Sequence, residues 1–256
     1  MHTKNPFLPL LALILLLAAT ASCQQQEVLV KHIIFDPDDV EVFAGSYQKV
    51  SVSTYPRFAE NEQDLEFIVG NKKVATFDGS SVIGISDGKT EILALCGDAS
   101  ATCQVRVYEW KLTLDGMYYG VSKSEGWLNN KGGSSSKELE ISLFHNTRET
   151  LHEFSVWIPV NLIGQTIDIN SDVPGVFAAG LFDISKDGYA VGTMNTGKPK
   201  VYRSDWSEAE DITVVKGSVR VERKETGNLF KVKASILLSN GFSFGADWEG
   251  ALPVTL

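Results

Sequence analysis

Acid–base or nucleophilic catalysis would need histidines or cysteines beside carboxylates, and this sequence spaces such residues widely. His32 stands alone, and His145 and His152 flank a polar turn, where we expect surface side chains. No Gly-x-Ser-x-Gly segment is present, and no closely spaced set of His and Cys has the pattern of a zinc site. We therefore expect no enzyme activity, no metal and no cofactor.

Two acidic segments have part of a calcium-ligand pattern. The stretch from Asp183 to Gly188 begins like a calcium loop, but its twelfth position is Met194 instead of an acid. Asp36, Asp38 and Asp39 supply three sequential carboxylates, whereas a calcium ion takes about six or more oxygen ligands. We interpret both segments as solvated turns.

Cys96 and Cys103 are the candidates for a disulfide, because an even pair of cysteines is typical of an exported chain. Ile92 to Cys96 and Cys103 to Val107 each alternate like a strand. The six residues between them, Gly97 to Thr102, are compatible with a hairpin loop, which would bring both thiols to one side at cross-strand distance. We expect a Cys96–Cys103 disulfide, with two free thiols as the alternative.

Two tryptophans are candidate ligand-binding residues, since aromatic side chains in polar loops often contact ligands. Trp127 and Trp206 lie in such segments, whereas Trp110, Trp157 and Trp248 lie in alternating runs and are expected in the core.

The neighbours of Trp127 and Trp206 could complete a sugar site. A sugar ring offers C–H faces that pack on indole, and Asn129, Asn130 and Asp205 could hydrogen-bond its hydroxyl groups. The alternative is that each indole ring folds back to cap an end of a sandwich.

The start of the chain is organised for export. Lys4 precedes an uncharged run from Phe7 to Ala21, which is shorter than the about 20 residues of a spanning helix. The segment ending at Cys23 resembles the lipobox of bacterial lipoproteins, although Thr20 replaces the usual aliphatic residue. The resemblance implies a signal peptide at 1–22, lipidation of Cys23 and a spacer at 23–27. The alternative is cleavage after Ala21, which would free a soluble protein.

Composition limits the partners and the size of the core. The 256-residue chain has 23 basic and 32 acidic residues, for a net charge of −9. It therefore has no basic footprint for nucleic acid. Hydrophobic residues make up 43% of the sequence, enough for a folded core.

Residues 28–109 alternate in short runs separated by turn residues, as in a β-sandwich. A family pattern is carried by residues 34–37, 40–45, 74–78, 82–85, 88–92 and 103–107. Through these residues the segment resembles the bacterial Ig-like domain of group 2, with Phe67 where that family usually has Trp. The resemblance implies a seven-stranded sandwich with a spacer or adhesive role.

Residues 110–256 keep the strand pattern. Phe230 to Leu238 is the longest alternating run, and Asn240-Gly241 predicts a hairpin after it. The pattern indicates an antiparallel β domain, either a sandwich or a small barrel. Residues 216–252 are similar to the ending of many uncharacterised Bacteroidetes lipoproteins, a resemblance that implies no activity.

The sequence therefore predicts an all-β protein, with an Ig-like β-sandwich followed by a second antiparallel β-sandwich or small barrel. We expect it to be lipid-anchored at the outer membrane or cell surface. The Ig-like part would be a spacer that presents a domain binding a glycan or a surface protein. The alternatives are a structural or anchor subunit of a surface fibre and an uncharacterised hydrolase.

Overall fold

Strands make up nearly all of the regular structure. The computed structural model describes residues 28–130, 137–147, 150–183, 187–193, 198–224 and 228–254, except the side chain of Asn130. These ranges contain 21 strands and two short 3-10 helices, η1 (Glu62–Asp64) and η2 (Val160–Leu162). The predicted all-β fold class is confirmed. The predicted signal peptide, Cys23 and the spacer lie outside the described residues.

The first sandwich contains nine short strands in two layers. They are β1 (His32–Asp36), β2 (Asp39–Phe43), β3 (Tyr47–Lys49), β4 (Ser51–Tyr55), β5 (Glu66–Val69), β6 (Ala75–Phe77), β7 (Ser81–Gly84), β8 (Gly88–Cys96) and β9 (Ala99–Tyr108). One layer has the order β2-β9-β8-β5, and the other is formed by β1-β4 and β3-β7-β6. The chain changes layers between β1 and β2, and β2 then pairs in parallel with β9.

Alternating side chains build the core of the first sandwich. Ile92, Ala94 and Cys96 of β8 are buried, while the residues between them are more exposed. Phe35 and Phe77 pack with Phe67, whose ring centroid lies 5.0 Å from that of Phe77. A period of two along each strand therefore places one apolar row inside the sandwich.

The predicted Cys96–Cys103 disulfide is wrong. The turn between β8 and β9 is only Gly97-Asp98, so Cys96 pairs with Ala99 while Cys103 lies opposite Ile92. The cysteines share one face but are separated by four positions along the hairpin, about 13 Å at the rise of a strand. A disulfide needs Cα atoms within about 7 Å of each other. Both thiols are free and buried.

The second sandwich contains twelve strands. They are β10 (Lys111–Leu114), β11 (Met117–Gly120), β12 (Lys123–Asn130), β13 (Lys137–Asn146), β14 (Leu151–Pro159), β15 (Thr166–Asp168), β16 (Phe177–Phe182), β17 (Asp187–Gly192), β18 (Lys200–Arg203), β19 (Val214–Arg223), β20 (Leu229–Leu238) and β21 (Ser243–Ala251). One six-stranded sheet has the order β11-β10-β21-β20-β19-β15, and the other β12-β13-β14-β16-β17-β18. Each sheet ends in edge strands, so of the two predicted architectures the protein has the sandwich.

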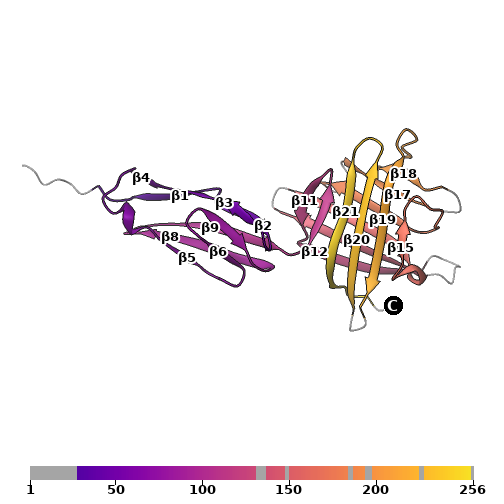
Figure 1. Ribbon diagram of the computed structural model, residues 1–256, viewed down its shortest axis with the longest axis horizontal. Helices are drawn as coiled ribbons and strands as arrows, with labels where there is room; N and C mark the ends of the chain where they lie inside the picture. Colours follow the sequence, from indigo (N-terminus) through magenta and orange to yellow (C-terminus); the bar gives the residue numbers. More distant parts are fainter. Residues whose placement is uncertain are drawn as a thin grey trace, which may run out of the picture.

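The two six-stranded sheets pack face to face, as Figure 1 shows for β20 and β21 in front of the second layer. Gly180 of β16 allows the sheets to approach closely, because a Cβ there would lie 2.5 Å from the Cβ of Phe244 on β21. Trp248 is buried in this core, as expected, and Trp110 packs partly against it. The predicted hairpin is also confirmed, with Gly241 at φ +90° between β20 and β21.

Candidate functional site

The outer face of the β12–β18 sheet carries an aromatic row. The inward residues of β13 and β14 belong to the core, so the alternate residues face outward. The pairing register places Trp127 of β12, Glu140 of β13, Trp157 of β14 and Phe177 of β16 in one line across four strands. Trp127 and Trp157 therefore flank Glu140 at about two strand spacings, roughly 10 Å.

Trp206 reaches the same face from a turn after β18. Trp206 N–H donates to the Arg203 carbonyl and Arg203 N–H to the Ser207 carbonyl, which closes a tight hairpin. Trp206 occupies the left-handed position of this turn, with φ +66°, where Gly is the usual residue. Its ring lies 6.2 Å from that of Trp157 and 6.4 Å from that of Tyr202. Because β16 and β17 separate β14 from β18, the Trp206 side chain extends back across the sheet.

We define the aromatic face as Trp127, Glu140, Trp157, Phe177, Tyr202 and Trp206. Trp127 is 43% exposed and Trp206 51% exposed, and Trp157, which packs against Trp206, is half-buried. Phe177 and Tyr202 are nearly buried and form a small apolar cluster with Trp157 on this outer side. The face thus combines a fixed apolar floor with indole rings open to solvent.

Polar groups border the aromatic face. Asn129 Nδ2 donates a hydrogen bond to Glu140 Oε2 at 3.1 Å, and both side chains are accessible. In the next cross-strand row, Ser142 Oγ and Ser155 Oγ are buried 2.5 Å apart, and Ser155 also donates to Glu153. Carboxylates and amides beside indole rings could bind hydroxyl groups while the rings pack on apolar surface.

The structure places only some of the predicted site residues on the aromatic face. Trp127, Asn129 and Trp206 belong to one face, although Trp127 lies in strand β12 and not in the loop that we expected. Asp205 accepts hydrogen bonds from Ser207 Oγ and N–H, which lower the pKa of its carboxyl. Asp205 therefore fixes the turn of Trp206. The side chain of Asn130 lies outside the described residues.

Trp157 was missed, because the prediction placed it in the core. The signal was present in the sequence: Phe154, Val156 and Ile158 are all buried, and the period of two puts Trp157 on the opposite side. Glu140 has the same relation to Leu139 and Ile141 on β13 and was not among the predicted site residues.

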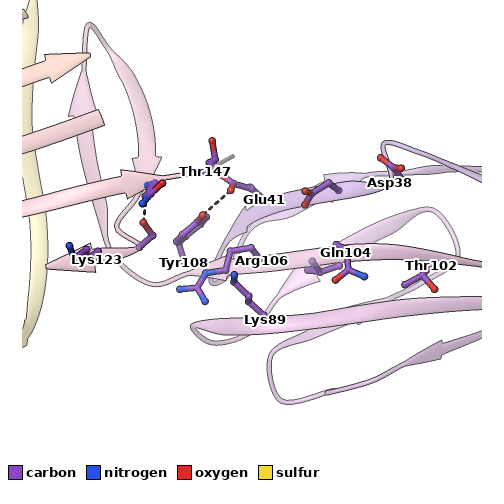
Figure 2. Close-up of a pocket in the computed structure, with 13 residues that line it drawn as sticks. Asp38, Glu41, Lys89, Thr102, Gln104, Arg106, Tyr108, Lys123 and Thr147 are labelled. Carbon is purple, nitrogen blue, oxygen red and sulfur yellow. Dashed lines mark hydrogen bonds between the residues drawn. The ribbon is translucent and has the colours of Figure 1, made fainter. Parts of the chain in front are cut away.

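A polar cleft of about 1110 Å³ lies where the two sandwiches meet (Figure 2). Figure 2 shows Glu41 on one side of Tyr108 and Lys89 and Arg106 on the other. Three acidic and three basic side chains line this cleft, so it has no strong preference for a ligand of one charge. The charged residues are Asp38, Asp39, Glu41, Lys89, Arg106 and Lys123.

Tyr108, the last residue of β9, contacts the second sandwich. Its hydroxyl donates a 2.8 Å hydrogen bond to Glu41. The pKa of this phenol is raised, mainly because the group is buried. Its ring covers Gly120, where a Cβ would lie 2.0 Å from the ring. His145 completes the contact: its Nδ1–H donates to the Gly120 carbonyl at 2.8 Å, and its Nε2 lies 3.7 Å from Glu41.

The two histidines expected at the surface are buried. His145 and His152 stack with centroids 5.9 Å apart, and burial lowers the pKa of His152. His152 lies 4.0 Å from Asp183, but neither histidine lines the cleft. Both serve the packing of this end of the second sandwich, beside Tyr119 and Phe182.

The described residues of the two segments with a partial calcium pattern are not gathered around a common point. Within the described ranges, no group of three or more His, Cys, Asp or Glu side chains is placed to hold a metal ion. Asp187 begins β17 opposite Phe182, whereas residues 184–186 and Met194 are outside those ranges. The same ranges contain no helix that is long and apolar enough to cross a membrane.

Comparisons with known proteins identify no family. The sequence matches no protein-family model and no curated protein. Among four solved chains that match the structure is the one titled "Structure of the S-layer protein SbsC, domains 5-6". It is 11% identical over 75% of this chain and 90% of that chain, with a TM-score of 0.28. At that score the similarity carries no argument about function.

Proposed function

We propose that this chain is a lipid-anchored protein of the cell envelope whose second sandwich binds a glycan on its aromatic face. The observation that carries the proposal is the shared face of Trp127, Trp157 and Trp206, with Glu140 between two of the rings. Exposed apolar patches of this kind usually mark a binding surface.

The chemistry of the face favours a sugar over a purely apolar partner. Indole rings pack on the C–H faces of a pyranose, while Glu140 and Asn129 can exchange hydrogen bonds with its hydroxyl groups. Trp206 supports the same interpretation, because a bulky residue in the left-handed region is uncommon and such outliers cluster at ligand-binding sites.

The first sandwich has the role of an Ig-like spacer in this proposal. It meets the second sandwich where the Tyr108 ring packs on Gly120 and on the His145 ring, and where His145 Nε2 lies 3.7 Å from Glu41. The spacer separates the glycan-binding face from an anchor at Cys23, which would hold the chain at the outer membrane or cell surface.

Affinity gel electrophoresis with amylopectin, laminarin, xylan and mannan tests the glycan site. We expect at least one polysaccharide to retard the wild-type protein, and Trp127→Ala and Trp157→Ala each to weaken the retardation about tenfold, the equivalent of one lost stacking contact. Tyr118→Ala is the matched control, because Tyr118 is an exposed aromatic residue on the other sheet. Equal loss in Tyr118→Ala, or no loss in the tryptophan variants, would contradict the proposal.

Membrane fractionation tests the anchor separately. We expect wild-type protein to remain in the membrane fraction after a salt wash and the Cys23→Ala variant to leave it, since one acylated residue supplies the whole tether. Retention of Cys23→Ala with the membranes would show that the anchor is not a lipid on this cysteine.

A second candidate is a subunit of a surface fibre, favoured by the edge of the same sheet. β12 runs from Lys123 to Asn130 and is the last strand of its sheet, so one side is available for a strand from another chain. Chemical cross-linking of intact cells distinguishes the two candidates. A ladder of homomultimers would favour the fibre, and a single band at the monomer mass would exclude it.

A further inference from the structure

Apolar side chains also gather at the opposite end of the molecule, where the described chain begins. Val28 and Leu29 are about half exposed, Tyr55 is 60% exposed and Phe58 is 90% exposed. Hydrogen bonds place them together, because Glu60 N–H donates to the Val28 carbonyl and Lys31 N–H to the Tyr55 carbonyl. We call Val28, Leu29, Tyr55, Arg57 and Phe58 the N-terminal pole. Strand β4 leads to it, at the end of the first sandwich away from the second (Figure 1).

Phe58 has a conformation that the first sandwich alone does not explain. Its φ is +62°, in the left-handed region that bulky L-residues avoid. Its ring gains almost no burial in return, and no ring contact of Phe58 occurs within the described part of the chain. A strained residue with a fully exposed ring indicates a contact outside the folded chain.

We propose that the N-terminal pole rests on the lipid surface that holds the anchor, with Phe58 and Tyr55 inserted among the headgroups. This inference rests on the proposed anchor at Cys23. Four residues separate Cys23 from Val28, so even a fully extended chain spans only about 17 Å between the two. The pole therefore stays beside the bilayer, and a weak apolar contact suffices because the tether makes it intramolecular.

The charges around the pole select the kind of lipid. Arg57 and Lys31 are basic, but Glu60, Glu62 and Asp64 follow directly in and beside η1. An anionic surface would repel these carboxylates, whereas a zwitterionic surface accepts aromatic rings at the level of its headgroups. The contact is therefore one with net-neutral lipid, driven by apolar burial.

This contact would orient the molecule. The pole and the second sandwich lie at opposite ends of the first sandwich (Figure 1). Insertion of Phe58 and Tyr55 would fix the end that is near the membrane and hold the aromatic face of the second sandwich away from it. A lipid tether without the pole contact would leave the whole molecule free to lie down on the membrane.

Fluorescence quenching by brominated phosphatidylcholine tests the inference. All five native tryptophans lie in the second sandwich, so Phe58→Trp adds the only indole of the first. The chain from residue 24, with an N-terminal histidine tag, is held on phosphatidylcholine vesicles that contain nickel-chelating lipid. We expect brominated lipid to reduce the added Phe58→Trp fluorescence at least twofold and to leave the native signal unchanged.

The matched control is Tyr47→Trp, because Tyr47 is 66% exposed on β3, away from the pole. We expect no quenching of its added fluorescence, and weaker quenching of Phe58→Trp when one third of the lipid is phosphatidylglycerol. Equal quenching at the two positions, or none at Phe58→Trp, would overturn the inference. Phe58→Gly gives an independent measurement: its melting temperature in solution should equal or exceed that of wild type, and a lower value would show that the ring serves the fold.

The chelating lipid replaces the native anchor in this experiment, so the result does not depend on lipidation of Cys23. If Cys23→Ala remains in the membrane fraction while Phe58→Trp is quenched, the anchor is wrong and the pole contact stands. If Cys23→Ala is released while Phe58→Trp is not quenched, the anchor stands and the pole contact is wrong.

Discussion

Because Trp206 has a left-handed backbone conformation, we predict an unusual order of stability for its substitution by Ala and by Gly. Trp206→Ala and Trp206→Gly both remove the ring that packs on Trp157 and Tyr202. Only Gly removes the backbone strain as well, since φ at this position is +66°. We therefore expect Trp206→Gly to be more stable than Trp206→Ala, the reverse of the order found in ordinary strands.

The magnitudes follow from the exposure of the ring. About half of the Trp206 side chain is buried, or roughly 100 Å² of the area that a tryptophan can bury. At about 25 cal/mol per Å², its removal costs roughly 2.5 kcal/mol. An L-residue in the left-handed region costs about 1–2 kcal/mol, and Gly loses about 0.4–1 kcal/mol more chain entropy than Ala. Trp206→Gly should therefore be more stable than Trp206→Ala by about 1 kcal/mol.

Urea denaturation followed by tryptophan fluorescence measures this difference, because the remaining four tryptophans also report on the second sandwich. Trp127 is the control: it lies in strand β12 with no positive φ, so Trp127→Ala should be more stable than Trp127→Gly by about 0.5–1 kcal/mol. If Ala equals or exceeds Gly in stability at position 206, the turn is not strained as described and the reasoning fails.

Three further predictions concern buried groups. Burial raises the pKa of both thiols, that of Cys103 to about 11, so we expect Cys96 and Cys103 to be unreactive at pH 8 in the folded protein. In denaturant without reductant, both thiols should react; if neither reacts, the two cysteines form the disulfide after all. Gly120→Ala should lower the free energy of unfolding by about 1–3 kcal/mol, because its Cβ would overlap the Tyr108 ring; unchanged denaturation would contradict this packing. Burial lowers the pKa of His152, so its contribution to stability is complete above about pH 6.5 and is lost as pH falls below it. His152→Phe should reduce the loss of stability between pH 7.5 and 5.5, and an unchanged loss would show that other groups cause it.

Strand type and inward faces could be predicted from the sequence because they depend on neighbouring residues. The alternation from Phe230 to Leu238 becomes strand β20, with Phe230, Val232, Ile236 and Leu238 in the core. Asn240-Gly241 predicted the hairpin after it for an equally local reason, since Gly accepts the positive φ that the turn requires.

Cross-strand register was harder to predict, and the cysteines show why. Sequence spacing placed a six-residue loop between Cys96 and Cys103, but both strands continue until only Gly97 and Asp98 remain in the turn. Each residue by which a hairpin lengthens shifts every partner along it, so the two thiols became separated although each strand had been recognised.

The candidate site was likewise predictable only in part. The sequence singled out Trp127 and Trp206 by the polarity of their surroundings, but 79 positions separate them in the chain. The structure places both on one outer face, since β12 and β14 flank the same strand and the Trp206 turn folds back onto Trp157. Trp157 was assigned to the core because it lies in an alternating run, and only its parity along β14 indicated the opposite face.

The sequence by itself determined that this protein is built of strands, which side of the run from Phe230 to Leu238 enters the core and that Asn240-Gly241 forms a tight turn, because these follow from the two-residue period and from Gly and Asn in turns. The tertiary structure alone decided which strands are neighbours, that the second part is a sandwich, that the thiols remain apart and that three tryptophans share a face. Those outcomes depend on contacts between residues far apart in the chain, and such contacts are selected by the packing of the whole core.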